Sequence, residues 1–431
     1  MKVGLLGCGN VGAALVELLD DRREAIHART GIDLEITRIA VRSTSKERPG
    51  ALAPELLTTD AESVVTDPSV DIVVEVIGGI EPARSLVLKA LEHGKPVVTA
   101  NKELLANVGA DLYAAADKAG VDLLFETAAA GAIPIIGPLR ESLLGEDITR
   151  ITGIFNGTTN YILTRMTEDG ASYGDALAEA QRLGFAERDP TADVEGYDSG
   201  AKAAIMASLA FGANVVAGDV YHEGISNVTK QDIAYARSLG YEIKLLAIAE
   251  TGFTDENGER GDEVAVRVHP AMIPQEHPLA AVRDSFNAVF VEGAASGELM
   301  FYGRGAGGFP SASAVLGDVI EAAQNLRNGT HRSVPTGPRV RIRPIDELVT
   351  EYYVNIEVHD TPGVLAAVAG VFGKHGVSIR SMEQHEASDG MARIAFITHD
   401  AKERDLQATL HELRALDVVE QVVGFLRVAG E

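Results

Sequence analysis

The chain begins with short apolar runs that alternate with segments of helical periodicity. The apolar runs predict strands at residues 2–6, 34–41, 71–76, 96–99 and 121–125. Between them, apolar residues recur three or four positions apart, which predicts helices at 83–93, at 104–118 and directly after the first strand. Mostly apolar strands separated by helices are typical of parallel sheets covered by helices. We therefore expect an α/β fold in which residues 1–128 form a Rossmann-type, doubly wound sheet, with ligands beyond the carboxyl ends of its strands.

After Glu126 the pattern becomes that of an α+β domain. Residues 151–166 predict a strand joined to a helix, with Thr158 or Thr159 placed to cap that helix. Further elements are expected as a helix near 175–183, strands at 264–269 and 288–300, and a helix at 314–326. The last helix is expected to return to the first sheet. We predict a substrate-binding and dimerisation domain at residues 129–303, with residues 304–327 completing the first domain.

The C-terminal part has a different order of elements. Residues 328–350 have the proline, glycine and arginine content of a linker. The pattern that follows predicts strand, helix, two strands, helix and strand at 352–358, 363–375, 377–386, 392–398, 405–416 and 418–427. This βαββαβ order predicts a ferredoxin-like domain at residues 351–431.

Composition narrows the class of protein. The 431 residues carry a net charge of −25, which argues against nucleic acid or an anionic membrane as a partner. The single cysteine, Cys8, excludes an internal disulfide framework and fits a reducing compartment. The longest uncharged run, residues 203–218, is shorter than the roughly 20 residues that span a bilayer. The N-terminus also lacks the pattern of a signal peptide, so we expect a cytoplasmic protein.

A glycine-rich segment joins the first strand to its helix. It reads Gly7-Cys8-Gly9-Asn10-Val11-Gly12, and strand, G-x-G-x-x-G and helix together form the fingerprint of a dinucleotide site. We expect cofactor contacts at Gly7, Gly9, Asn10, Val11 and Gly12. The alternative interpretation is a glycine-rich turn without a ligand.

The second strand ends at Arg42, where NAD-specific sites usually have an acidic residue. Lys46 and Arg48 lie close by in the sequence. Basic residues at this point favour the 2′-phosphate of NADP. The alternative is a solvated basic loop.

The most unusual chemistry lies at residues 184–202. Five carboxylates fall within twelve residues: Glu187, Asp189, Asp193, Glu195 and Asp198. Lys202 follows at the entrance of an apolar helix, four positions after Asp198, so the two share a helical face. Burial lowers a lysine pKa, which makes Lys202 a candidate acid/base group. An ordinary surface ion pair is the alternative. Lys102, directly after the strand at 96–99, is a second candidate ligand contact.

Several long motifs resemble one family. They are the fingerprint, VVTANKELLA at 97–106, GIFNGTTNYIL at 153–163, GFAERDPTADVEGYDSGAK at 184–202 and VHDTPGVLAAVAGVFGKHGVSI at 358–379. Over nearly its whole length the chain resembles a monofunctional homoserine dehydrogenase with a C-terminal ACT domain.

The resemblance implies roles for individual residues. It implies that Lys202 is the acid/base lysine, that Glu187 and Asp198 hold the substrate, and that Lys102, Gly184 and Gly307 border the cofactor and active site. It also implies a monovalent cation, sodium or potassium, at Glu126 and at the backbone carbonyls of Ala129, Gly131 and Ile133. The family commonly reads E-A-S-V-x-G-G-I-P where this chain has ETAAAGAIP at 126–134.

The implied reaction interconverts L-homoserine and L-aspartate 4-semialdehyde with NADP, or also NAD, in threonine, methionine and isoleucine biosynthesis. The ACT resemblance implies an amino-acid effector at the turn formed by residues 360–364, with L-threonine as the leading candidate. The family further implies a homodimer or homotetramer.

Three other classes of protein share some of these features. A phosphorylating semialdehyde dehydrogenase needs a thiolate in its substrate domain, yet Cys8 lies in the fingerprint. A zinc alcohol dehydrogenase needs clustered cysteine and histidine ligands, which the pattern lacks. A nonenzymatic sensor of dinucleotide and amino acid stays open as an alternative.

Overall fold

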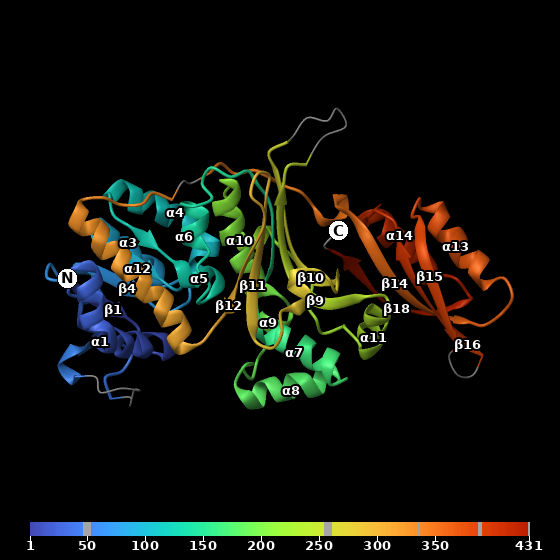
Figure 1. The fold of residues 1–431 in the computed structure, drawn as a ribbon, viewed down its shortest axis with the longest axis horizontal. Coiled ribbons are helices and arrows are strands. Elements are labelled where there is room, and N and C mark those ends of the chain that lie inside the picture. The colour runs from blue at the N-terminus through green and yellow to red at the C-terminus, as the bar shows by residue number, and fades with distance from the viewer. Residues whose placement is uncertain (46–52, 254–260, 335–336, 387–389, 430–431) are drawn as a thin grey trace.

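The computed structural model describes residues 1–45, 53–253, 261–334, 337–386 and 390–429. Three parts follow one another along the longest axis of the molecule: a nucleotide-binding-type domain, a central domain and a C-terminal domain (Figure 1). Lys46 and Arg48, which contributed to the expected NADP preference, lie outside the described residues.

The first domain is a six-stranded parallel sheet with the strand order β3-β2-β1-β4-β5-β6. Its strands are β1 (Lys2–Leu6), β2 (Glu35–Ala40), β3 (Leu57–Thr58), β4 (Ile72–Glu75), β5 (Val97–Thr99) and β6 (Leu123–Leu124). Its helices are α1 (Asn10–Thr30), α2 (Ala61–Thr66), α3 (Ala83–Glu92) and α4 (Lys102–Ala119). The strands are buried on both faces because helices cover both sides of the sheet. The predicted doubly wound α/β sheet is confirmed.

A helix from far along the chain completes this domain. Helix α12 (Gly308–Asn328) packs along α1, and Val315 and Val319 share a hydrophobic core with Leu15 and Leu19. It starts at Gly308, earlier than the expected residue 314, because the glycine-rich stretch supplies the first turn of the helix as well as the loop before it.

The central domain is built on long antiparallel strands. These are β7 (Ile148–Ile154), β9 (Tyr241–Thr251), β10 (Glu263–Pro274), β11 (Phe286–Gly293) and β12 (Gly297–Arg304), with the short β8 (Tyr221–His222) paired in parallel with β10. The helices are α5 (Glu126–Ala130), α6 (Ile136–Arg140), α7 (Gly157–Glu168), α8 (Tyr173–Leu183), α9 (Thr191–Val194), α10 (Tyr197–Phe211) and α11 (Lys230–Ser238). Helix α10 packs on β9 and β10 and also contacts α4 of the first domain. The core of this domain therefore fixes α10 against helix α4 of the first domain.

The C-terminal domain has the predicted βαββαβ order. Its elements are β14 (Val349–His359), α13 (Val364–Lys374), β15 (Ile379–Glu386), β16 (Met391–Thr398), α14 (Glu403–Leu413) and β18 (Val419–Val428). The strand order β18-β14-β16-β15 is that of a ferredoxin-like sheet. Strand β18 also pairs in parallel with β10, Ala271 opposite Arg427 and Met272 opposite Val428, so the sheets of the two domains join.

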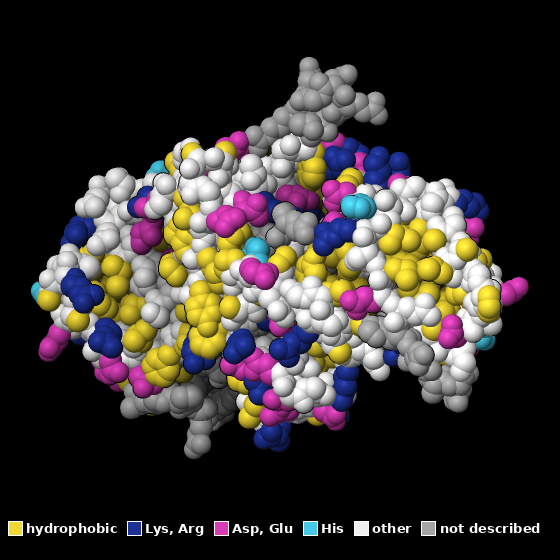
Figure 2. Space-filling view, turned by 45° about the vertical axis from the view of Figure 1, so that its right-hand side comes forward, with side chains coloured by type: hydrophobic (Ala, Val, Ile, Leu, Met, Phe, Trp, Pro, Cys, Tyr) yellow, Lys and Arg dark blue, Asp and Glu magenta, His cyan; other side chains and the backbone are white. Residues whose placement is uncertain are grey.

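The segment between the central and C-terminal domains is held in place. Strand β13 (Arg341–Ile342) pairs with β10, and the amide of Arg343 donates to the carbonyl of Val264 at 2.9 Å. Acidic and basic side chains are interspersed on the face shown in Figure 2, so the negative net charge is not gathered there. Among the described residues, no helix is both long and apolar enough to cross a membrane.

Candidate active site

The turn after β1 has the shape of an anion site. Gly7 adopts φ +98°, and a Cβ on Gly12 would lie 2.5 Å from the carbonyl oxygen of Gly7, so both positions need glycine. Gly9 has open space where its side chain would be. Helix α1 starts at Asn10 and Val11 with no acidic residue in its first turn and no side-chain cap, which leaves its first amides free for a phosphate.

Arg42 lies just beyond the end of β2, as the sequence predicts, and is exposed. Within the described residues its guanidinium has no acidic partner. The amide of the preceding Val41 donates to the carbonyl of Thr58 at 2.8 Å, which fixes the backbone at this end of the strand. The position is therefore open to a charged ligand.

Two polar residues that were not predicted as site residues lie at the carboxyl ends of strands β4 and β5. Glu75, fully buried at the end of β4, accepts from the amides of Ile77 and Gly78 at 2.8 and 3.1 Å and from the Thr99 hydroxyl at 2.5 Å. Asn101 caps α4 by accepting from the Leu104 amide at 3.0 Å and donates to the carbonyl of Gly79 at 2.6 Å. An acid within an apolar strand was the available signal for Glu75.

The central feature is a carboxylate shared by two lysines. Lys202 Nζ lies 2.8 Å from Asp198 Oδ2, one turn earlier on α10, and donates to the carbonyl of Phe155 at 2.6 Å. Lys102 Nζ, from the first turn of α4, pairs with the other oxygen of Asp198. The side chains of Asp198 and Lys202 are 5% and 9% exposed, whereas that of Lys102 is 44% exposed. The structure thus brings together three of the predicted site residues from two domains.

The environment sets opposite protonation tendencies in this cluster. Burial lowers the pKa of Lys202, and the ammonium of Lys102 adds to the effect, although Asp198 opposes it. Burial would raise the pKa of Asp198, but the two ammonium groups outweigh it and hold that pKa well below its usual range. A buried lysine beside a permanently ionised carboxylate is suited to proton transfer.

The expected helix cap is wrong. Asn156, and neither Thr158 nor Thr159, caps α7, because its side-chain oxygen accepts from the Thr159 amide at 2.8 Å. Its amide nitrogen also donates to Asp198 Oδ2 at 2.9 Å and to Asp193 Oδ1 at 2.7 Å. The Thr158 hydroxyl instead donates to the carbonyl of Phe185 at 2.7 Å. An amide supplies an acceptor and two donors, whereas a hydroxyl has only one hydrogen to donate.

Asn156 and Asp193 are therefore site residues that sequence reasoning missed as such. Burial raises the pKa of Asp193, and the neighbouring Asp198 adds to this, while the bond from Asn156 opposes it. The strong preference of asparagine for helix N-caps was the available signal for Asn156.

The loop that carries Glu187 lies next to this cluster but leaves its carboxylate in solvent. Gly184 ends α8 in the left-handed conformation at φ +79°, and Gln181 Nε2 donates to the carbonyl of Glu187 at 3.0 Å. Glu187 is exposed, and its carboxylate has no hydrogen bond or ion pair within the described residues. The structure does not join Glu187 to Lys202 by direct contact.

The turn after β6 brings a carboxylate close to several backbone carbonyls in sequence. The carboxylate of Glu126 accepts from the amides of Ile135, Ile136 and Gly137 at 2.5, 2.7 and 2.9 Å. The carbonyls of Ala129, Gly131 and Ile133 belong to buried residues and accept no hydrogen bond within the described chain. Unsatisfied buried carbonyls beside a carboxylate fit a cation with oxygen ligands.

Gly307 connects this turn to the fingerprint. It has φ +130° and precedes the first residue of α12, and a Cβ on Gly308 would lie 3.2 Å from the Asn10 carbonyl. A Cβ on Gly131 would lie 2.1 Å from the Gly305 carbonyl. The glycine-rich loop therefore packs against both the start of α1 and the turn after Glu126.

Comparison with known proteins agrees with this arrangement. Family models match residues 7–126 ("Homoserine dehydrogenase, NAD binding domain"), 134–320 ("Homoserine dehydrogenase") and 352–418 ("ACT domain"). The homoserine dehydrogenase of Corynebacterium glutamicum is 50% identical over 427 residues, covering 99% of this chain and 95% of that protein. This chain belongs to the homoserine dehydrogenase family.

Solved homoserine dehydrogenases match either the whole of this chain or about three quarters of it. The crystal structure of a homoserine dehydrogenase from Thiobacillus denitrificans has a TM-score of 0.92 and 42% identity, covering 100% of this chain and 98% of that one. A hyperthermophilic archaeal homoserine dehydrogenase mutant in complex with NADPH has a TM-score of 0.62 and 28% identity, covering 75% of this chain and 97% of that one. The family resemblance, the fold class and the C-terminal ACT domain are thereby confirmed.

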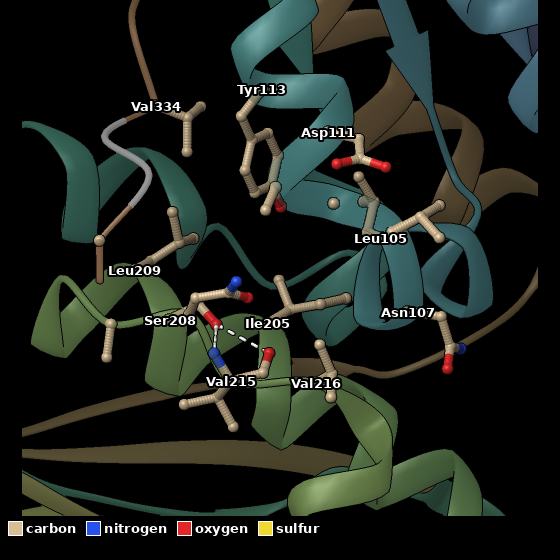
Figure 3. Close-up of a pocket in the computed structure, with 16 residues that line it drawn as sticks. Leu105, Asn107, Asp111, Tyr113, Ile205, Ser208, Leu209, Val215, Val216 and Val334 are labelled. Carbon is tan, nitrogen blue, oxygen red and sulfur yellow. Dashed lines mark hydrogen bonds between the residues drawn. The ribbon is translucent and has the colours of Figure 1, made fainter. Parts of the chain in front are cut away.

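A cavity of about 160 Å³ lies behind the site, between the two helices that carry its lysines (Figure 3). Leu105 and Tyr113 of α4 face Ile205 and Ser208 of α10 across it. Val108 departs from helical geometry at φ −133°, so α4 is kinked where it borders the cavity. Helices α4 and α10 are thus in direct contact at the lysines and are separated by a cavity farther along.

Proposed function

We propose that this chain is a homoserine dehydrogenase that reversibly interconverts L-homoserine and L-aspartate 4-semialdehyde, in threonine, methionine and isoleucine biosynthesis. The observation that carries the proposal is the buried Lys202 ammonium, held by Asp198 and the Phe155 carbonyl at the carboxyl edge of a dinucleotide-type sheet. A bound nicotinamide dinucleotide would supply the hydride chemistry there.

Lys202 serves as the proton-transfer group. Two of the three ammonium N–H bonds go to Asp198 and Phe155, and within the described residues the third has no acceptor, so it is available to the substrate oxygen. The neutral amine accepts the hydroxyl proton during oxidation, and the ammonium returns it during reduction. Asp198 keeps the lysine oriented and remains ionised throughout.

The remaining substrate contacts follow from charge. The exposed carboxylate of Glu187 is assigned to the substrate ammonium, and the part-exposed Lys102 to the substrate carboxylate. Asp198 orients both lysines and so helps to hold the substrate. Gly184 and Gly307 shape the border with the cofactor, since their positive φ values set the two loops that face it.

For the cofactor, we propose that Gly7, Gly9, Asn10, Val11 and Gly12 hold the pyrophosphate. Open space at Gly9 and the free amides at the start of α1 support this. Arg42 would select NADP over NAD, because its exposed guanidinium has no acidic partner in the described chain and follows the strand where the ribose is read.

We propose a sodium or potassium ion at Glu126 and the carbonyls of Ala129, Gly131 and Ile133. Neutral carbonyls with one carboxylate suit a monovalent cation better than magnesium. The ion would act structurally, by joining this turn to the glycine-rich loop against which Gly131 packs.

The same proposal divides the chain into four functional segments. They are residues 1–128 together with 304–327, residues 129–303, residues 328–350 and residues 351–431. In this proposal, the ACT domain binds an amino-acid effector, L-threonine, at residues 360–364, and the enzyme works as a homodimer or homotetramer. Gly363 at φ +97° precedes α13, and no side chain caps the start of that helix.

The deciding experiment follows reduced-nicotinamide absorbance when purified protein is mixed with L-homoserine and NADP⁺. Turnover that depends on both compounds is expected from the wild type. Binding of both compounds without turnover would identify the nonenzymatic sensor instead. A Lys230→Ala control, altering an exposed lysine on α11, should retain wild-type turnover.

A further inference from the structure

A second cavity, of about 200 Å³, lies where the central domain meets the segment leading into the ACT domain. It opens beside β10, between the short strands β8 and β13, which both pair with that strand. Its lining residues are Asp219, Val220, Tyr221, Val266, Arg267 and residues 342–345 and 348. This volume admits several waters or a small organic molecule.

Arg267 is the central polar residue of this cavity. It is 7% exposed, and within the described chain its guanidinium makes one hydrogen bond, from Nη1 to Glu250 Oε1 at 2.5 Å. Nε and Nη2 have no protein acceptor among the described residues, yet neither is sealed from solvent. Because Arg267 lines the cavity, a ligand there can reach these unused donors.

The guanidinium groups at Arg267 outnumber the carboxylates that neutralise them. Glu250 serves two guanidiniums, since Arg150 Nε lies 3.4 Å from its second oxygen. Burial lowers the pKa of Arg267, and Arg150 adds to that effect against Glu250. A buried, under-neutralised guanidinium beside a cavity is an incomplete ion pair.

The other charged lining residues do not supply the missing anion. Arg343 pairs with Glu263 at 3.3 Å, and Arg341 pairs with both Glu263 and Glu347, so these two carboxylates are already engaged. Asp219 already holds both Nη atoms of Arg339, at 2.7 and 3.2 Å. The cavity therefore has a net positive lining.

The remaining walls are apolar: Val220, Val266, Ile342, Ile345 and Leu348. We propose that this cavity binds a small aliphatic carboxylate, its carboxylate on Arg267 and its hydrocarbon chain against these residues. An Arg–carboxylate pair in a partly dehydrated site is among the stronger polar contacts in proteins. The site is independent of the nicotinamide chemistry proposed above.

Isobutyrate is the direct probe, tested on the full chain by thermal unfolding and by titration calorimetry. Isobutyrate should raise the unfolding temperature in a saturable way, whereas isobutylamine, which has the same chain without the carboxylate, should not. L-Valine distinguishes the source of the carboxylate: tighter binding than isobutyrate indicates an amino-acid ligand, and weaker binding indicates a simple carboxylic acid. Inorganic phosphate that binds in place of isobutyrate would overturn the assignment.

Two variants locate the binding. Arg267→Gln should weaken isobutyrate binding at least ten-fold, and it leaves Glu250 paired with Arg150. Ile345→Trp should block the cavity while leaving Arg267 in place, because Ile345 is only half-buried. Arg283→Gln, at an exposed arginine of the same domain that does not line the cavity, is the matched control. Unchanged binding in both cavity variants, or no binding by the wild type, would refute the proposal.

Discussion

Arg427 of the ACT domain and Glu223 of the central domain form an ion pair across their junction, with Nη1 2.7 Å from Oε2. Arg427 is 2% exposed and also holds Glu403 through two hydrogen bonds of 2.8 Å. Glu223 directly follows His222, whose Nε2 would lie 2.0 Å from a Cβ on Gly200 of α10. A chain of direct contacts therefore runs from the ACT sheet to the helix that carries Lys202.

Glu223→Gln should weaken effector inhibition without removing catalysis. Loss of the charge weakens the junction contact to a neutral hydrogen bond, while Arg427 keeps both bonds to Glu403, so the ACT domain stays folded. We expect threonine to inhibit the variant at least five-fold less tightly, with turnover in its absence within two-fold of wild type. Inhibition curves for both proteins provide the measurement, and identical curves would exclude this contact from the coupling.

A point substitution tests this coupling better than truncation before Tyr352. Truncation removes β18 from its pairing with β10 and leaves Glu223 without Arg427. Reduced activity of the truncated chain would then mix loss of regulation with damage to the central sheet.

Lys202→Ala should reduce turnover by about two to four orders of magnitude, because it removes the proton-transfer group. Asp198 keeps Lys102 and Asn156 as partners, so the site should stay assembled and cofactor affinity should be nearly unchanged. Steady-state rates and cofactor titration provide the measurement, with Lys230→Ala as the control. Turnover within a few-fold of wild type would remove Lys202 from the mechanism.

The pH profile gives an independent check on Lys202. Its lowered pKa means that homoserine oxidation should rise with pH and level off below the range of an ordinary lysine. Asp198→Asn removes a carboxylate that raises this pKa. The rising part of the pH–rate profile should therefore move to lower pH, while the maximal rate falls. If the rising part of the profile lies at the same pH in Asp198→Asn as in the wild type, a different group titrates.

Arg42→Asp should reverse part of the cofactor preference. A carboxylate repels the 2′-phosphate of NADP and can accept the ribose hydroxyls of NAD. We expect kcat/KM for NADP to fall by at least ten-fold more than that for NAD. Equal losses with the two cofactors would show that Arg42 does not read the phosphate.

Glu126→Gln should weaken a monovalent-cation effect on stability. The wild type is expected to unfold at a higher temperature in sodium or potassium chloride than in an equal concentration of a bulky organic cation. The variant keeps an oxygen acceptor for the amides of residues 135–137 but loses the charge, so this difference should shrink. Melting curves that do not depend on the cation in the wild type would refute the site.

Because of Lys244, the free energy of unfolding should depend on pH in the alkaline range. Burial lowers its pKa to about 8, and its ammonium donates to the Val282 carbonyl at 2.6 Å without a close acidic partner in the described chain. Between about pH 8 and 10.5 the unfolded chain binds the proton that the folded chain has released, so this group makes stability rise with pH across that window.

Lys244→Met should remove this dependence. The free energy of unfolding of the variant should exceed that of the wild type most below pH 8, where Lys244 is charged in both the folded and the unfolded wild type. This difference in free energy should shrink by about 3 kcal/mol as pH approaches 10.5. Denaturant unfolding at several pH values measures the difference, with the exposed Lys230→Met as the control. A constant difference between variant and wild type across pH would show that Lys244 does not titrate in this way.

Local patterns in the sequence predicted most of the elements. Apolar strands and helical periodicity placed the doubly wound sheet and the βαββαβ order, because backbone geometry and burial of one face leave a signal within a few residues. The fingerprint glycines were recognisable for the same reason, since positive φ and close backbone approach are local requirements. Asp198 and Lys202 could be paired because they are one helical turn apart.

Tertiary structure alone decided which distant residues meet. Lys102 reaches Asp198 across 96 positions of sequence, and Arg427 reaches Glu223 across 204. Asn156 became the link between Asp193 and Asp198 because α7 begins beside α10, a placement that no local pattern encodes. The two-residue pairing of β18 with β10 likewise depends on how complete domains pack. Such contacts follow from the burial of whole surfaces, and a sequence read without relatives carries no local record of them.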